Sequence, residues 1–226
     1  MKAFGAPALL SFNGGFVDTA GFVGLQGLFT AHVTGNFVTL AATLISGPHG
    51  VIAKLLALPE FIAVVAVARL AGAALAARNM SALRTLLVAK VVFLLAFFIL
   101  AVALGPFPDS DAPAALLTGF AGVSGMAIQN AVQRVHFASI PPTTLTTGNT
   151  TQAVLDAVDL LRGVEPTQAA AIRARFGRTY RSIVWFAGGC AVSAVLYYWV
   201  GFWSLAVPVA VGAATAILRV EDRQIK

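Results

Sequence analysis

Two copies of the tripeptide Thr-Gly-Asn are the strongest chemical signal in the chain. They are Thr34-Gly35-Asn36 and Thr147-Gly148-Asn149, and they lie 113 positions apart in a sequence of 226 residues. Threonine and asparagine are good helix N-caps, and glycine allows an unusual backbone angle, so each triplet predicts the start of a helix. The unpaired N–H groups at such a start attract an anion or a polar solute.

Polar residues also interrupt the apolar runs. Asp18 lies well inside the apolar run 6 to 29, where an ionised carboxylate costs about 2.5 to 3.5 kcal/mol on membrane-insertion scales. We expect Asp18 to couple protons or to bind the solute directly; the alternative is an ion pair with Arg69. His32, two residues before the first triplet, is expected to be a polar member of the first re-entrant segment rather than a catalytic base. Glu60 and Lys90 are placed near helix ends, where they can snorkel, and are given no chemistry.

An amide-bearing stripe marks a third polar region. Gly122, Met126, Gln129 and Gln133 follow the spacing i, i+4, i+7 and i+11, with Asn130 beside them. This spacing places them on one helix face, either lining a polar path or forming hydrogen bonds between helices. The candidate substrate-binding residues are therefore Asp18, His32, Thr34, Gly35, Asn36, Gln129, Asn130, Gln133, Thr147, Gly148 and Asn149.

One motif favours the hypothesis that the protein is an enzyme. The segment Gly122-Val123-Ser124-Gly125 fits the G-x-S-G pattern of rhomboid intramembrane proteases. A buried serine needs a general-base histidine, and residues 182 to 218 contain none. No H-E-x-x-H or paired aspartate motif is present, and the single Cys190 forms neither an internal disulfide nor a cysteine-based metal site. We assign no catalytic residue, no metal and no cofactor.

Composition identifies the class of protein. Hydrophobic residues make up 58% of the chain and charged residues only 11%, against about 25% charged in a soluble domain. An ordinary water-soluble globule is therefore excluded. The net charge of +6 comes from cations clustered between apolar runs, which indicates membrane topology rather than nucleic-acid binding.

Six apolar runs are long enough to cross a bilayer, and two shorter helical patterns are not. The two short patterns, 36 to 46 and 149 to 161, each follow a Thr-rich stretch and suit half-helices. The basic segment 163 to 181 is expected to lie on the inner leaflet, attracted by anionic lipid. The six expected spans are 6 to 29, 55 to 77, 83 to 105, 114 to 133, 182 to 200 and 202 to 218.

The positions of the cations predict the topology. Clusters of cations at two connections and at the end of the chain place these three segments in the cytoplasm, and counting spans back from them places the N-terminus there too. The two half-helices then enter from opposite faces. We predict an all-α polytopic membrane protein with a single membrane domain, 1–226. Its repeats, 1–112 and 113–226, are inverted, and each has three transmembrane helices and a re-entrant half-helix.

Several segments carry a family resemblance. Gly14-Gly15-Phe16-Val17-Asp18, His32-Val33-Thr34-Gly35-Asn36, Gly125-Met126, Gln129-Asn130-Ala131 and Thr146-Thr147-Gly148-Asn149 resemble the YoaK family of bacterial membrane proteins, whose function is unknown. The resemblance implies a bacterial inner-membrane protein of about six helices. It makes Asp18, Asn36, Gln129, Asn130 and Asn149 the matched motif positions, and it implies no reaction or substrate.

These observations favour a secondary membrane transporter for a small anionic or polar metabolite, with proton coupling through Asp18. A passive channel and a non-transporting scaffold or sensor are the alternatives. The expected partners are a small-molecule solute and membrane lipid, with no nucleic acid; self-association into a homo-oligomer is left open.

Overall fold

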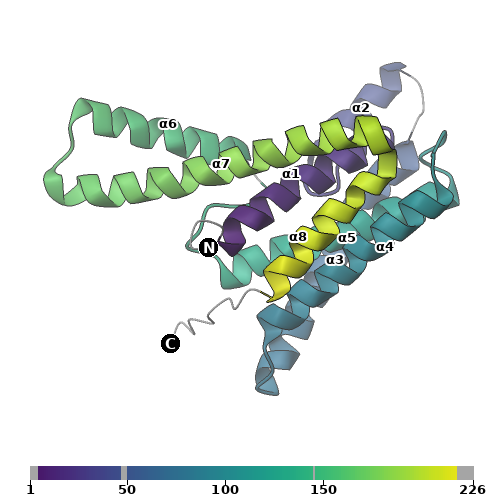
Figure 1. The fold of residues 1–226 in the computed structure, drawn as a ribbon, viewed down its shortest axis with the longest axis horizontal. Coiled ribbons are helices and arrows are strands. Elements are labelled where there is room, and N and C mark those ends of the chain that lie inside the picture. The colour runs from purple at the N-terminus through teal and green to yellow at the C-terminus, as the bar shows by residue number, and fades with distance from the viewer. Residues whose placement is uncertain (1–4, 47–49, 145, 218–226) are drawn as a thin grey trace.

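The computed structural model describes residues 5–46, 50–144 and 146–217, and every regular element in that part of the chain is helical (Figure 1). Two of the elements, α2 and α6, begin at or next to the Thr-Gly-Asn motifs, as predicted. The elements are α1 (Ala6–Gly24), α2 (Gly35–Ser46), α3 (Val51–Ala77), α4 (Ala82–Leu104), α5 (Pro113–His136), α6 (Thr146–Arg162), α7 (Pro166–Val200), the short 3₁₀ helix η1 (Gly201–Leu205) and α8 (Ala206–Ile217).

Four stretches of the described chain are long and apolar enough to cross a membrane. They are α3, α4, α5 and the continuous stretch Pro166–Ile217. A helix needs about 20 predominantly apolar residues for this. The chain is therefore a membrane protein, as its composition predicts.

The first apolar run contains a reversal that the sequence prediction missed. Helix α1 ends at Gly24 rather than at residue 29. Gln26 and Gly27 have φ values of 51° and 86°, in the left-handed region that terminates helices. The chain then folds back along α1, so that the amides of Thr30 and Ala31 reach Asp18. We call residues 25–34 the first return loop.

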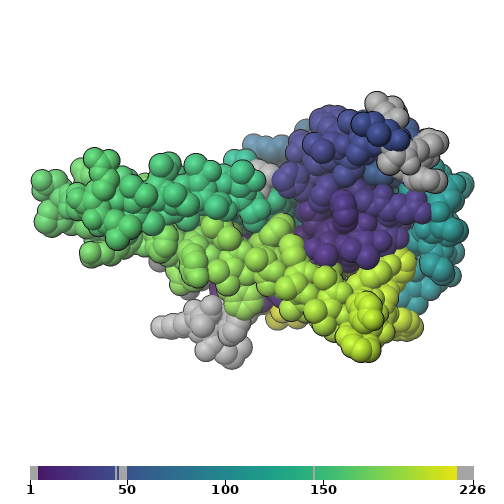
Figure 2. All heavy atoms as spheres, turned by 90° about the horizontal axis from the view of Figure 1, so that it is seen from above, coloured from purple at the N-terminus to yellow at the C-terminus, as the bar shows by residue number. Residues whose placement is uncertain are grey.

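Helix α7 also differs from the prediction. The segment 163 to 181 was expected to be a separate interfacial helix, but it joins the following run in one helix of 35 residues. No proline follows Pro166 within α7, so nothing in the sequence breaks the helix before Gly201. Helix α6 packs against the first half of α7, and the two form a hairpin that projects from the bundle (Figures 1 and 2).

The helices pack in pairs that correspond between the two halves. Helix α1 lies on α7, and α5 lies on α3. The α1–α7 contact depends on Gly15 and Gly189, since a Cβ at either position would collide with the facing backbone at Phe186 or Phe12. This close approach brings the second half of α7 against the middle of α1.

Two apolar clusters form the core. The first apolar cluster includes Val17, Leu94, Phe97 and Met126. The second includes Leu10, Leu87, Ile128 and Val132. Lys90 lies on the same face of α4 as Leu87 and Leu94 and is 0% exposed, so the prediction that it snorkels to a helix end was wrong.

Candidate functional site

The carboxylate of Asp18 holds the first return loop. Its Oδ1 accepts hydrogen bonds from the backbone N–H groups of Thr30 (2.8 Å), Ala31 (2.8 Å) and His32 (3.3 Å), and from Thr30 Oγ1 (3.4 Å). Arg69 is exposed and lines a separate cavity of about 120 Å³ between α3, α4 and α5. The alternative of an Asp18–Arg69 ion pair was therefore wrong.

Side-chain amides hold the segment that follows α5. Residues 137–144 form what we call the second return loop. Gln129 Nε2 donates to Thr143 Oγ1 (3.2 Å), and Thr144 Oγ1 donates to Asn130 Oδ1 (2.8 Å). Gln133 Nε2 donates to the carbonyl of Phe137 (3.0 Å). The amide stripe predicted on this helix is thus used within the protein to position the loop.

The asparagine of each Thr-Gly-Asn motif binds the backbone seven residues earlier. Asn36 makes two hydrogen bonds with Phe29, accepting from its N–H and donating to its carbonyl, both at 2.9 Å. Asn149 Nδ2 donates to the carbonyl of Pro142 at 2.7 Å. Proline has no N–H, so the second contact has one hydrogen bond. Each asparagine therefore clamps its return loop at the start of the following helix.

A cavity of about 640 Å³ lies between the first return loop and the second motif. His32 from that loop lines it, together with Thr147, Gly148 and Asn149 from the second motif. The remaining lining residues come from the second return loop and from α6 and α7, and they are Ala138, Ser139, Ile140, Pro141, Pro142, Gln152, Arg175, Arg178 and Thr179.

The charges around this cavity favour an anion. Arg175 and Arg178 line it, and none of its lining residues within the described part of the chain is an aspartate or a glutamate. The cavity also touches the first turn of α6, where the backbone N–H groups have no acceptor within the helix. Two guanidinium groups and a helix N-terminus together attract negative charge.

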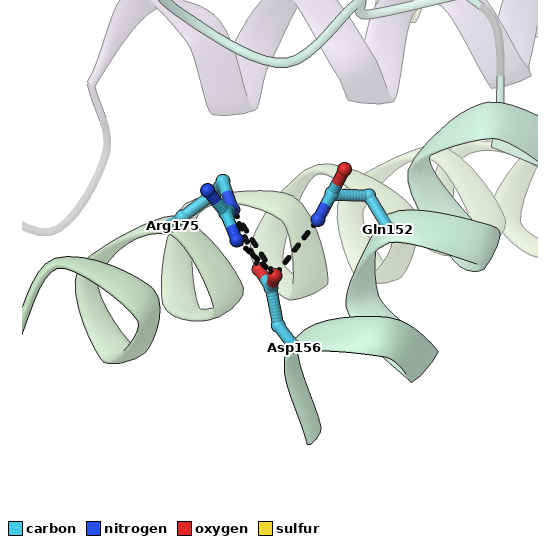
Figure 3. Close-up of polar contacts among 3 residues, drawn as sticks. All are labelled: Gln152, Asp156 and Arg175. Atoms are coloured by element: carbon cyan, nitrogen blue, oxygen red, sulfur yellow. Dashed lines mark hydrogen bonds and ion pairs between the residues drawn. The ribbon is translucent and has the colours of Figure 1, made fainter. Parts of the chain in front are cut away.

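One of these arginines already has a partner (Figure 3). Arg175 Nη2 lies 2.6 Å from Asp156 Oδ1, and Gln152 Nε2 donates to the same oxygen at 2.8 Å. The Asp156 side chain is 0% exposed and that of Arg175 is 48% exposed. The guanidinium holds the pKa of the Asp156 carboxyl below its usual value. Of the two lining arginines, Arg178 is therefore the one available to bind an anion.

Four of the eleven sequence-predicted site residues meet at this cavity, and seven do not line it. The four are His32, Thr147, Gly148 and Asn149. Five of the others hold a return loop or its helix start, and they are Asp18, Asn36, Gln129, Asn130 and Gln133. Those outside the cavity lining are Asp18, Thr34, Gly35, Asn36, Gln129, Asn130 and Gln133.

Sequence reasoning missed Arg175 and Arg178 as site residues. Their spacing of three places them on one face of a helix, and that was the available signal. It was assigned to a lipid-facing surface because α7 was expected to break near residue 181.

The serine of the G-x-S-G pattern has a carboxylate partner. Ser124 Oγ on α5 donates to Glu60 Oε1 on α3 at 2.7 Å. Glu60 Oε2 is buried without a hydrogen-bond partner among the described residues, so Glu60 does not snorkel as expected. Within the same residues no three histidine, cysteine, aspartate or glutamate side chains group as a metal site.

Comparisons with known proteins place the chain in a family without an assigned activity. No curated protein and no solved structure matches it. A family model described as "Protein of unknown function (DUF1275)" matches residues 6–218, and the name YoaK is not part of that match. Because the match covers nearly the whole sequence, the chain belongs to this DUF1275 family of proteins of unknown function.

Proposed function

We propose that this protein is a secondary transporter for a small anionic metabolite, which it binds in the 640 Å³ cavity between the first return loop and the second motif. The observation that carries the proposal is the lining itself: His32, Arg178 and the first turn of α6 surround one space, and no described residue of that lining is acidic. The volume lies within the range of about 300 to 1,000 Å³ that is usual for small-molecule sites.

The correspondence between the two halves supports a repeat. Each motif asparagine binds the backbone seven residues earlier, at Phe29 and at Pro142. Each return loop is held by the preceding helix, at Asp18 in one half and at Gln129 and Asn130 in the other. In this proposal α2 and α6 are re-entrant half-helices of two inverted repeats, a design in which the solute binds where the repeats meet.

The proposed topology has six spans: α1, α3, α4, α5, the second half of α7, and η1 together with α8. Both termini face the cytoplasm, and the protein lies in a bacterial inner membrane. The arginines of α7 then face the inner leaflet, as the positive-inside rule favours. The cavity lies near the same arginines, so the site opens toward the cytoplasm in this conformation.

Asp18 is proposed as the coupling carboxylate. It is the acceptor for three successive backbone amides of the loop that carries His32. A hydrogen bond to an ionised group is stronger than one to a neutral group. Adding a proton to Asp18 therefore loosens the loop and moves His32 in the cavity wall.

A thermal-shift screen tests the binding site. The purified protein is mixed with inorganic phosphate, sulfate and short mono- and dicarboxylates, and a ligand that binds the folded state raises its melting temperature. We expect at least one anion to do so, and Arg178→Gln to abolish the shift. Arg173→Gln is the matched control, because Arg173 lies on the same basic segment and does not line the cavity. No shift with any of these anions, or equal shifts in both variants, would count against the site.

Liposomes test the transport activity and separate it from a channel. Uptake of the anion found in the screen is measured with and without an imposed proton gradient. A transporter coupled through Asp18 concentrates the anion against its gradient, and Asp18→Asn loses this ability. A passive channel only equilibrates the anion, and a scaffold or sensor moves none.

A further inference from the structure

A polar layer crosses the bundle between the two apolar clusters. On α1, Asn13 lies between Leu10 of the second cluster and Val17 of the first. On α4, Lys90 lies between Leu87 and Leu94, and on α5, Gln129 lies between Met126 and Val132. In all three helices a polar residue therefore lies at the boundary between the first and the second apolar cluster.

Lys90 brings a buried donor to this layer. Its side chain is 0% exposed, and its Nζ has no hydrogen-bond partner anywhere in the described chain. An isolated charge without a partner is very costly in an apolar interior. A protonated Lys90 therefore needs acceptors at this level of the bundle.

Asn13 and Gln129 bring two acceptors, both oriented by their other hydrogen bonds. Asn13 Nδ2 donates to the carbonyl of Pro208 at 3.2 Å, and Gln129 Nε2 donates to the carbonyl of Leu10 at 2.8 Å. Because a carbonyl oxygen only accepts, each amide nitrogen must face its carbonyl. The oxygens Oδ1 and Oε1 then face away, and both are buried without a donor.

Packing at two glycines places the three side chains at the same level. A Cβ at Gly212 on α8 would lie 3.2 Å from Val91 and 3.6 Å from Asn13 Nδ2, so Asn13 lies beside the turn of α4 that carries Lys90. A Cβ at Gly125 would lie 3.2 Å from Leu94. Since α4 and α5 run in opposite directions (Figure 1), the next turn of α5, with Gln129, lies beside the preceding turn of α4.

We propose that this layer is a hydrated proton-binding site in which Lys90 gains and loses the proton. In this proposal one water molecule bridges the unmatched groups: it accepts a hydrogen bond from Lys90 Nζ and donates one each to Asn13 Oδ1 and Gln129 Oε1. Deprotonation gives a neutral amine and one proton, which goes to bulk solvent. The lone pair of the resulting amine later accepts a proton from the solvent.

Among the described residues, no carboxylate on the helices packed against α4 is available to form an ion pair with Lys90. Helices α5 and α8 and the 3₁₀ helix η1 contain no acidic residue within the described chain. Helix α5 carries Arg134 and His136 at its end, and α3 carries Lys54, Arg69 and a single acid, Glu60, which binds Ser124. Asp18 on α1 binds the first return loop. The proposal adds a proton site distinct from Asp18, and it holds whether or not the protein transports anions.

The dependence of melting temperature on pH tests the proposal in the purified protein without any solute. We expect the difference in melting temperature between the wild type and Lys90→Met to change by several degrees between about pH 5 and pH 10, because a group that exchanges protons links stability to pH. Leu87→Met is the control, since it puts the same side chain one turn away in an apolar position. Its effect should be the same at every pH.

A difference that stays constant with pH would overturn the proposal and leave Lys90 with a packing role. If Lys90→Met does not fold, Lys90→Gln serves in the same comparison. The bridging water has its own test: Asn13→Leu removes one of its acceptors and should shift the pH at which the Lys90-dependent change is half complete. An unchanged midpoint would overturn the role of the water.

Discussion

The first return loop is held by one carboxylate, whereas the second is held by side-chain amides. The difference follows from the backbone donors that each loop presents. The first loop offers three successive N–H groups at Thr30, Ala31 and His32, and a carboxylate oxygen accepts them together. The second loop contains Pro141 and Pro142, which have no N–H, and it offers hydroxyl and carbonyl groups that amides can match.

This comparison separates a return loop held by a titratable group from one held by groups that do not titrate. A change of pH acts on the Asp18 carboxylate but not on Gln129, Asn130 or Gln133. The two return loops can therefore respond differently to protons. The predictions below test that asymmetry, beginning with the largest expected effect.

Asp18→Ala should be the most destabilising substitution in either return loop. It leaves buried N–H groups of Thr30 and Ala31 without an acceptor, and each such group costs about 1 to 3 kcal/mol. We expect a loss of about 3 to 5 kcal/mol and a fall in melting temperature of about 10 °C. Gln129→Ala, in the other half, should cost less. Thermal unfolding of both variants checks this, and a larger effect of Gln129→Ala would contradict the comparison.

The two motif asparagines should differ in the same direction. Asn36 makes two hydrogen bonds with Phe29, and Asn149 makes one with Pro142. At about 1 kcal/mol for each bond, Asn36→Ala should cost about 2 kcal/mol and Asn149→Ala about 1 kcal/mol. Chemical denaturation measures both values. Equal losses would mean that the missing N–H of Pro142 has no energetic consequence.

The two motif glycines should give effects of opposite sign. A Cβ at Gly35 would lie 2.9 Å from the ring of Phe29, whereas nothing lies within 4 Å of a Cβ at Gly148. Gly35→Ala should therefore destabilise the protein by about 1 kcal/mol. Gly148→Ala should stabilise it by about 0.5 kcal/mol, because alanine loses less backbone entropy in a helix. Melting temperatures decide the signs, and a destabilising Gly148→Ala would argue against open space beside α6.

The smallest expected effect is acid sensitivity in the α6–α7 hairpin. Arg175 holds the pKa of Asp156 below its usual value. The unfolded value is about 3.9, so the ion pair stabilises the folded state above that pH and loses its effect as the pH falls through the lower folded value. The difference in melting temperature between the wild type and Asp156→Asn should therefore shrink below about pH 4. Glu165→Gln is the control, and an equal pH dependence there would contradict the prediction.

Much of this arrangement could be predicted from the sequence because it depends on composition and local signals. The helices α3 and α4 follow from uninterrupted apolar runs, and the starts of α2 and α6 follow from the two motifs. The reversal after Gly24 could not be predicted in the same way, because Leu25, Leu28 and Phe29 continue the apolar run past the turn. The decisive signals were Gln26 and Gly27, with backbone angles that a hydrophobic pattern does not reveal.

The candidate site was predicted only in part, because local sequence patterns do not show where a long helix continues. A motif search finds Asn149, which belongs to the second triplet, and His32, which lies two residues before the first. It does not find Arg178, which reaches the cavity only because α7 continues unbroken across the expected boundary. The burial of Lys90 was not predicted, because the prediction considered only how close Lys90 lies to the end of its apolar run. Its spacing from Leu87 and Leu94 places it on the buried face of α4.

Because α7 is uninterrupted, it also connects the cavity to the contact with α1 through a single helix. The helix is about 52 Å long at 1.5 Å per residue, and it runs from the hairpin, past Arg178, to the glycine contact with α1. If the proposed solute draws Arg178 inward, the same helix carries that displacement to its contact with Gly15, which lies three residues from Asp18.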